Sequence, residues 1–314
     1  MKYLFFLIFV LTSPWLQAAP LAFITNQGEH TVSVIDIKQQ KVLKTIPVGK
    51  APVGVVTAPK LGLVFISNVD SQDVSVIDSK QLQVIQQIAI GGSPVGLALS
   101  PDETRLFVAD WTADRVHIYD THSFQRIDSI DVGKAPAGLL LSRDGQMLIV
   151  ANRDDNQIVL VDPNHHQPMQ TLAVQKHPFG MSLSHDGQRL YVVNVLSNSV
   201  SIVQLNHLSE PMQHITVGEH PYCVVESLDG RYLMVTNTQD DDVSVIDLTL
   251  GKQIKRINVG AVPEGIDIDP ITGLVLVANW SSGDLSLIDS QQLVLIKQIK
   301  TGDKSRSFGQ FILQ

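Results

Sequence analysis

Three things are scarce in this chain of 314 residues, and each scarcity excludes a class of protein. It has one cysteine, Cys223, so no disulfide can form within the chain, and we expect that thiol to be a small buried apolar group. Basic residues number 23 against 31 acidic ones, and the net charge of −8 argues against a nucleic-acid surface. Beyond residue 20 no apolar run approaches the ~20 residues that cross a bilayer, so we expect no membrane span there.

The N-terminal residues have the layout of a secretory signal peptide. Lys2 supplies a short basic region, residues 4–11 form an apolar run, and small residues follow up to Ala18. A membrane anchor is the alternative, but the run is shorter than the ~20 residues that a bilayer requires. We therefore expect residues 1–18 to be a cleaved signal peptide and residues 19–314 to be a single exported domain, periplasmic or secreted.

A four-residue motif occurs seven times, and its spacing indicates the architecture. Each copy ends in Asn or Asp, and successive copies start 42, 42, 42, 42, 43 and 42 residues apart. Internal periods of about 40–50 residues are typical of propellers and arrays. The copies are FITN (23–26), FISN (65–68), FVAD (107–110), IVAN (149–152), YVVN (191–194), MVTN (234–237) and LVAN (276–279).

Each period divides into four short apolar runs that are separated by turn residues. Between Pro94 and Gly133 the runs are four to seven residues long and rich in Val, Ile and Leu, which is the strand signal and not the helical one. A second motif, on the third run, recurs in phase with the first, as in Val74–Asp78 and Val243–Asp247. Four antiparallel strands per repeat describe a propeller blade. We predict an all-β, seven-bladed β-propeller with four antiparallel strands per blade.

The two ends of the chain explain how the ring closes. The chain enters at Leu21 directly on a strand of the second type, so the first blade lacks its innermost strand. The last segment, Ser307–Gln314, resembles an innermost strand with nothing after it. We predict that this segment pairs with residues 21–26, because closure removes the exposed sheet edges that invite aggregation.

The two motifs, recurring in phase over all seven units, resemble the YVTN-type β-propeller repeat family. The resemblance implies an exported seven-bladed propeller, in a group whose members mostly lack a known activity. More distant likenesses are the haem-d1-binding propellers of nitrite reductases and of their maturation proteins, the propeller lactonases and the streptogramin lyases. Haem-d1 propellers typically have eight blades, whereas this chain has seven repeats.

The loops that lead into the innermost strands share a Pro-x-Gly pattern, and the positions that break it are the functional candidates. Pro stops the preceding outer strand, and Gly lets the backbones crowd at the axis. For the Asn residues that end the second strands we expect hydrogen bonds to the backbone of the following turn. In the seventh loop we assign Phe308 to the x position. The candidate ligand-binding residues, all at one mouth of the channel, are His177, His220, Phe179, Tyr222, Glu264, Arg306, Phe308, Trp111, Trp280 and Arg153.

Two interpretations of this cluster stay open. It caps the core of the propeller, or it lines a pocket in which aromatic rings give contact area and a few polar groups give orientation. We expect no metal site, because only Glu264 and Cys223 are available to join the two histidines, and zinc usually needs three or four ligands. His177 or His220 with Glu264 would serve acid–base chemistry, but no nucleophile motif supports covalent catalysis.

These observations lead to two hypotheses about function. The first is a monomeric, non-enzymatic binding or scaffold module that presents the His and aromatic mouth to a small molecule or a partner protein. The alternative is an enzyme or cofactor-handling accessory at the same mouth, with lyase-like or lactonase-like acid–base chemistry or with haem binding. The sequence does not name a cofactor, and it identifies no catalytic residue.

Overall fold

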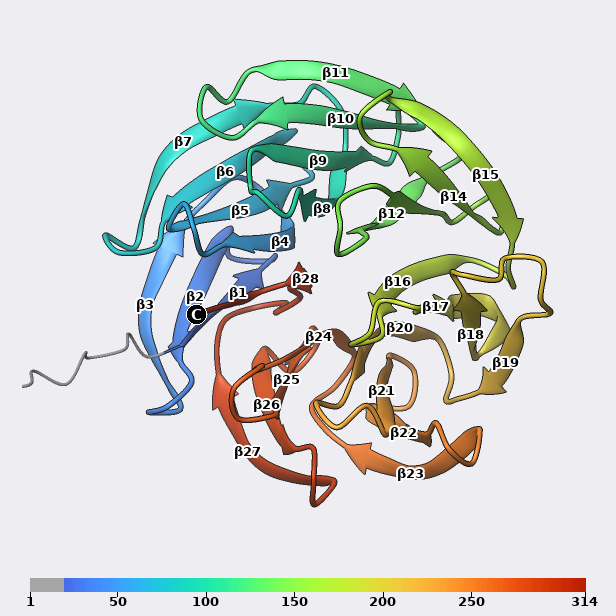
Figure 1. Ribbon diagram of the computed structural model, residues 1–314. Coiled ribbons are helices and arrows are strands. Elements are labelled where there is room, and N and C mark those ends of the chain that lie inside the picture. Colours follow the sequence, from blue (N-terminus) through green and yellow to red (C-terminus); the bar gives the residue numbers. More distant parts are fainter. Residues whose placement is uncertain (1–19) are drawn as a thin grey trace, which may run out of the picture.

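The computed structural model describes residues 20–314, so the predicted signal peptide lies outside the described residues. Seven sheets stand around a central axis like the blades of a propeller (Figure 1). Six sheets have four strands, and one gains a fifth from the C-terminal segment. The predicted all-β, seven-bladed architecture is confirmed: residues 20–314 contain no α-helix, and their one helical turn is the 3₁₀ turn η1, Val195–Ser197.

The strands occupy four positions from the axis to the rim, and neighbours within a blade pair antiparallel. The innermost strands are β4 (Pro52–Ala58), β8 (Pro94–Leu99), β12 (Pro136–Leu141), β16 (Pro178–Leu183), β20 (Pro221–Glu226) and β24 (Pro263–Ile268). The second strands are β1 (Leu21–Asn26), β5 (Leu63–Asn68), β9 (Arg105–Asp110), β13 (Leu148–Asn152), β17 (Arg189–Asn194), β21 (Tyr232–Asn237) and β25 (Leu274–Asn279). The third strands are β2 (Thr31–Asp36), β6 (Asp73–Asp78), β10 (Arg115–Asp120), β14 (Gln157–Asp162), β18 (Ser199–Gln204), β22 (Asp242–Asp247) and β26 (Asp284–Asp289). The outermost strands are β3 (Lys41–Pro47), β7 (Gln83–Ala89), β11 (Arg126–Asp131), β15 (Gln167–Ala173), β19 (Gln213–Thr216), β23 (Lys252–Asn258) and β27 (Val294–Lys300).

The second strands are apolar on both faces because each blade is packed between two others. In β5, Val64, Phe65 and Ile66 are all fully buried, so the strand appears in the sequence as a continuous apolar run without alternation. The outermost strands face solvent and bury little; in β3 only Ile46 is buried. Most of the apolar core therefore lies in layers between the blades.

The Pro-x-Gly pattern has the structural role that we predicted for its glycine. A Cβ added to Gly96 would lie 1.9 Å from the carbonyl oxygen of Ala137 in the next blade, so the backbones do crowd at the axis. The Asn residues behave differently from the prediction. Asn68 Nδ2 donates to side chains of the third strand, Asp73 Oδ1 at 2.6 Å and Ser75 Oγ at 2.9 Å, and so ties two strands of one blade together.

The ends of the chain close the ring as predicted. The short strand β29 (Ile312–Leu313) pairs antiparallel with β1, and Ser305 bridges to Asn26 at the other end of that strand. Between these contacts the segment bulges, and β28 (Phe308–Gln310) pairs in parallel with β4 of the neighbouring blade. Phe311 is fully buried at this junction. In Figure 1 the red C-terminal segment lies beside the blue first blade.

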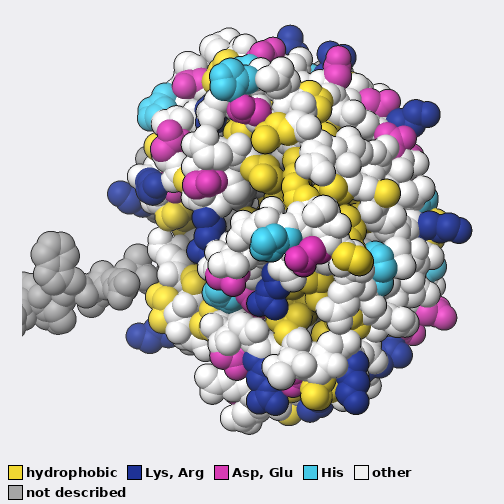
Figure 2. Space-filling model, turned by 45° about the vertical axis from the view of Figure 1, so that its right-hand side comes forward, with side chains coloured by type: hydrophobic (Ala, Val, Ile, Leu, Met, Phe, Trp, Pro, Cys, Tyr) yellow, Lys and Arg dark blue, Asp and Glu magenta, His cyan; other side chains and the backbone are white. Residues whose placement is uncertain are grey.

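The surface carries charges of both signs. In Figure 2 basic and acidic side chains are interspersed over the visible face, and apolar side chains reach the surface in a band between them. No helix within residues 20–314 is long and apolar enough to cross a membrane.

Candidate functional site

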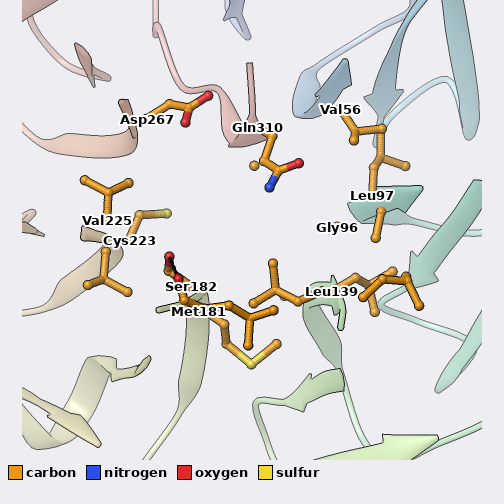
Figure 3. Close-up of a pocket in the computed structure, with 18 of the residues that line it drawn as sticks. Val56, Gly96, Leu97, Leu139, Met181, Ser182, Cys223, Val225, Asp267 and Gln310 are labelled. Atoms are coloured by element: carbon orange, nitrogen blue, oxygen red, sulfur yellow. Dashed lines mark hydrogen bonds between the residues drawn. The ribbon is translucent and has the colours of Figure 1, made fainter. Parts of the chain in front are cut away.

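The channel along the axis holds a cavity of about 530 Å³ that the innermost strands enclose (Figure 3). Its walls are mostly aliphatic, and the lining includes Val56, Leu97, Leu139, Met181 and Val225. Polar groups interrupt these walls, among them Ser182, Cys223, Asp267 and Gln310. A largely apolar concave site with a few polar groups is the usual form of a small-molecule pocket.

One end of this channel is filled by side chains from the lead-in loops. The rings of Phe179 and Tyr222 lie 4.4 Å apart between centroids, and those of Phe179 and Phe308 lie 4.8 Å apart. All three are at most 9 % exposed. They form one apolar cluster with the x residues of three other lead-in loops, Val53, Val95 and Ala137. We call this the closed end of the channel, and it lies on the face that carries the predicted site.

The seventh lead-in loop aligns differently from the prediction. In the other loops the proline pairs with the Asn or Asp that ends the second strand of the same blade, and Ser305 pairs with Asn26 in the same way. Ser305 therefore takes the place of the proline, and Arg306, not Phe308, occupies the x position. The carbonyl of Arg306 lies 2.3 Å from the place of a Cβ at Gly265, as the carbonyl of Ala137 lies close to that of Gly96. Phe308 lies two residues further on, in the bulge. The shift was hidden in the sequence because a serine replaces the proline that marks the other loops.

A buried ion pair completes the closed end. Arg306 Nε lies 2.6 Å from Glu264 Oε2, as an ion pair without an aligned hydrogen bond, and Arg306 also donates to the hydroxyl of Tyr222 at 2.5 Å. Burial raises the pKa of Glu264, and the neighbouring charge of Arg306 offsets part of this rise. The guanidinium of Arg306 thus contacts both the carboxylate of Glu264 and the hydroxyl of Tyr222 beside the apolar cluster.

The two predicted histidines hold equivalent places in adjacent lead-in loops. His177 and His220 both adopt the left-handed backbone region, with φ of 56° and 50°. The backbone N–H of His177 donates to Asn156 Oδ1 at 2.9 Å, and the backbone N–H of His220 donates to Asn198 Oδ1 at 3.0 Å. Their Nδ1 atoms are buried and have no hydrogen-bond partner among the described residues. Burial lowers the pKa of His177, and the positive charge of Arg153 lowers it further.

The two tryptophans separate. The ring of Trp111 lies 6.1 Å from that of Phe179, and the guanidinium of Arg153 lies 5.4 Å above Trp111, so these groups cover the closed end from outside. Trp280 instead donates its ring N–H to Gln27 at 3.0 Å. The structure thus brings together Phe179, Tyr222, Glu264, Arg306, Phe308, Trp111 and Arg153. As a ligand site the predicted set stays a prediction, since the described cavity lies below this cluster.

The cavity opens on the opposite face, where turns join the innermost strands to the second strands. Three of these turns read Ser-x-Asp-Gly, and Arg143 and His185 stand at x in adjacent blades. Both line the cavity. The stem of Arg143 lies against the next turn, with Cδ 3.3 Å from the place of a Cβ at Gly187. We call this the open rim. The sequence-based prediction missed the open rim. Arg143 and His185 break the pattern of a repeated turn as clearly as His177 breaks the pattern of the lead-in loops.

His185 is held by a buried carboxylate. Its Nδ1 lies 2.5 Å from Glu226 Oε2, and its backbone N–H donates to the same oxygen at 2.7 Å. The other oxygen, Oε1, accepts the hydroxyl of the fully buried Tyr191 at 2.8 Å, and Arg189 lies 3.4 Å away. Burial, followed by the hydrogen bond to Glu226, raises the pKa of Tyr191. The His185 side chain remains 45 % exposed, and Nε2 is the ring nitrogen that Glu226 does not contact.

A second carboxylate lies deeper in the cavity. Asp267 Oδ2 accepts the backbone N–H groups of Phe311 at 2.8 Å and Ile312 at 3.0 Å. Burial raises the pKa of Asp267 to about 7, although these hydrogen bonds favour the charged form. The exposed side chain of Gln310 points into the cavity nearby (Figure 3).

Fold and cavity define a seven-bladed β-propeller whose channel is closed at one end and open at the other. The family model described as the cytochrome D1 heme domain matches residues 10–144 and 218–307, more than half of the chain, and the chain belongs to that family. The sequence indicated this family only as a distant likeness. The model of the seven-bladed β-propeller lactonases matches residues 120–226.

Several solved structures have a similar fold at low sequence identity to this chain. Hydrazine synthase of Kuenenia stuttgartiensis is 19 % identical with a TM-score of 0.78, over 85 % of this chain and 92 % of that one. A functionally unknown protein from Desulfotomaculum acetoxidans is 15 % identical with a TM-score of 0.73, over 92 % and 99 %. Dihydro-heme d1 dehydrogenase NirN, solved in complex with DHE, is 19 % identical with a TM-score of 0.68, over 92 % and 66 %. No protein of curated function matches this sequence.

Proposed function

We propose that this protein is an exported binding propeller that holds a tetrapyrrole of the haem d1 type at the open end of its cavity. The family supports this ligand class, as does the likeness to a dehydrogenase named for dihydro-heme d1. Export rests on the predicted signal peptide. The first hypothesis of a binding module is kept, and the alternative of haem handling supplies its ligand.

The residues at the open rim fit such a ligand. Haem iron is commonly held by a histidine, and a ligating histidine donates its other ring N–H to an acceptor such as a carboxylate, a backbone carbonyl or water. His185 has this arrangement, with Nδ1 2.5 Å from Glu226 Oε2, Nε2 outside that contact and the side chain 45 % exposed. The aliphatic walls suit a macrocycle, and Arg143 offers a positive charge to an acidic substituent. The pairing of His185 with Glu226 at an apolar cavity is the observation that carries the proposal.

In this assignment His185 would hold the iron and Arg143 would meet an acidic side chain of the macrocycle. A bound iron tetrapyrrole would supply redox chemistry. The residues of the chain itself would orient the ligand and keep water from its apolar edge.

Titration of the purified protein with ferric haem b, followed by absorption, tests the proposal. We expect saturable binding at one equivalent for the wild-type protein and at least a tenfold weaker affinity for His185→Ala. His207→Ala is the matched control, because His207 is exposed and lies outside the cavity lining. Absence of binding to the wild type, or equal binding by His185→Ala, overturns the proposal.

A cavity-filling variant locates the ligand independently of the histidine. Leu139→Trp places a bulky ring in the cavity, where Leu139 lines the wall. We expect this variant to lose both ferric haem b and metal-free protoporphyrin IX, whereas His185→Ala keeps the metal-free ligand. Wild-type affinity of Leu139→Trp for both ligands would place the site outside the cavity.

The predicted site at the closed end gives the second candidate, a scaffold that presents His177 and His220 to a ligand. Its supporting observation is that the Nδ1 atoms of both histidines are buried without a hydrogen-bond partner among the described residues. The same titration decides between the two ends. Loss of haem b binding in the double variant His177→Ala, His220→Ala, with normal binding in His185→Ala, would favour the closed end.

A further inference from the structure

Glu226 breaks the pattern of its position in the innermost strands. The equivalent residues of the other strands β4, β8, β12, β16 and β24 are Thr57, Leu99, Leu141, Leu183 and Ile268. Glu226 is only 3 % exposed, and a carboxylate taken out of water requires strong partners. The fold alone therefore does not explain an acidic residue at this place.

The partners of Glu226 divide between its two oxygens. Oε2 receives both the backbone N–H and the ring nitrogen Nδ1 of His185, while Oε1 receives the hydroxyl of Tyr191 and lies near Arg189. Since a carboxylate has no proton to give, the proton between Nδ1 and Oε2 belongs to the imidazole. The electron pair of the neutral ring is then on Nε2, on a side chain that is 45 % exposed and lines the cavity.

A second buried carboxylate, three blades away, shows that capping a turn does not require the contact with a ring. Glu103 is also buried, and its two oxygens accept the backbone N–H groups of Lys60 at 3.3 Å and Leu61 at 3.1 Å in the adjacent blade. Both hydrogen bonds of the Glu103 carboxylate thus come from the backbone, and neither comes from a histidine ring. Capping thus accounts for the contact of Glu226 with the backbone N–H of His185, but not for the contacts with the His185 ring and with Tyr191.

We infer that Glu226 is a positioning residue that fixes the tautomer of His185 and, through its charge, makes Nε2 a strong donor toward a ligand at the open rim. The inference rests on the proposed function for the identity of that ligand. A histidine hydrogen-bonded to a carboxylate is a more basic ligand and favours the more highly charged state of a bound metal. Tyr191 sets the strength of the effect, because its hydroxyl draws charge from the other oxygen of Glu226.

The tautomer of His185 can be measured on the protein without any ligand. In ¹⁵N NMR of the imidazole, above the pH at which the ring is protonated, we expect the proton on Nδ1 in the wild type. In Glu226→Gln we expect a mixture of tautomers or the proton on Nε2. Glu103→Gln is the matched control and should keep the wild-type signal. A proton on Nε2 in the wild type, or an unchanged tautomer in Glu226→Gln, overturns the inference.

The reduction potential of the haem b complex gives a second readout, and its two variants should move in opposite directions. Glu226→Gln should weaken ferric relative to ferrous affinity and raise the potential; a tenfold change corresponds to about 59 mV for one electron. Tyr191→Phe should leave more charge on Glu226 and lower the potential. Shifts of the same sign in both variants, or shifts equal to that of Glu103→Gln, overturn the inference. Failure of the wild type to bind haem b contradicts the proposed function alone, and the tautomer still tests Glu226.

Discussion

The carboxylate of Asp267 accepts the backbone N–H of Phe311 at 2.8 Å, so the sheet of β24 anchors the segment that closes the ring. The same oxygen accepts the N–H of Ile312 at 3.0 Å. Asp267, in the neighbouring blade, thus holds two successive N–H groups of the segment that leads into β29. Ring closure therefore depends on a titratable group that lies on the wall of the cavity.

The stability of the protein should depend on pH through Asp267. Burial raises its pKa in the folded chain from 3.8 to about 7. Between these values the folded chain binds this proton and the unfolded chain releases it, so the free energy of unfolding falls as the pH rises through this window. In Asp267→Asn we expect this fall, a few kcal/mol at most, to be smaller when urea unfolding is measured at several pH values across the window.

Asp162→Asn is the control for this experiment. The Asp162 side chain is 26 % exposed, and the hydrogen bond with His165 lowers its pKa to about 2. Its contribution to stability is present above the unfolded pKa and is lost only as the pH falls toward 2. If the free energy of unfolding falls equally steeply with pH in Asp267→Asn and in the wild type between the two pKa values of Asp267, then Asp267 is not the titrating group.

Removal of residues 311–314 should open the ring. The deletion takes away β29, the fully buried ring of Phe311 and both hydrogen bonds to Asp267. Loss of a buried Phe side chain alone typically costs about 3–5 kcal/mol, so we expect at least that loss of unfolding free energy in urea. Deletion of Gln314 alone is the control, since this residue is exposed. A loss under about 1 kcal/mol for the longer deletion would show that β1 holds its blade without the C-terminal strand.

The blades and their closure were predictable because each depends on local patterns that repeat. The turn residues, the apolar runs and the spacing of the Asn positions recur in phase, so seven copies support one interpretation. The ends were predictable for the same reason, since a missing strand at Leu21 and a spare strand after Ser307 complete one repeat. Local sequence and global fold agree, as they do in chains that fold to one structure.

The site was predictable only in part. Pattern breaks correctly indicated that Phe179, Tyr222 and Glu264 lie together, because equivalent positions in a ring of blades meet at the axis. Repeats do not reveal which end of a channel is filled by its own side chains, since this depends on the size of the rings that meet there. The contact between His185 and Glu226 also escaped prediction, because it joins two blades across 41 residues.

The buried pair of Glu264 and Arg306 should behave as a unit. Removal of one partner of a buried pair leaves an uncompensated charge and typically costs 3–5 kcal/mol. Arg306 keeps some contact with water, its side chain being 21 % exposed, so we expect about 2–3 kcal/mol for Glu264→Gln in urea unfolding. The double variant Glu264→Leu, Arg306→Met should lose less than the sum of the single Glu264→Leu and Arg306→Met variants. Strict additivity of the two single variants would show that the pair is not coupled.

The thiol of Cys223 should report on the cavity. Its sulfur points into the cavity (Figure 3), yet the residue is only 6 % exposed, and burial raises the pKa of the thiol. Because the thiolate is the reactive form, we expect reaction with DTNB at pH 8 to be slower than for the urea-unfolded chain by roughly a hundredfold or more. Bound ferric haem b should slow the reaction further in the wild type, and this effect should disappear in Leu139→Trp. A native rate within tenfold of the unfolded rate would contradict a buried thiol, and no protection by haem b would place the ligand away from this wall.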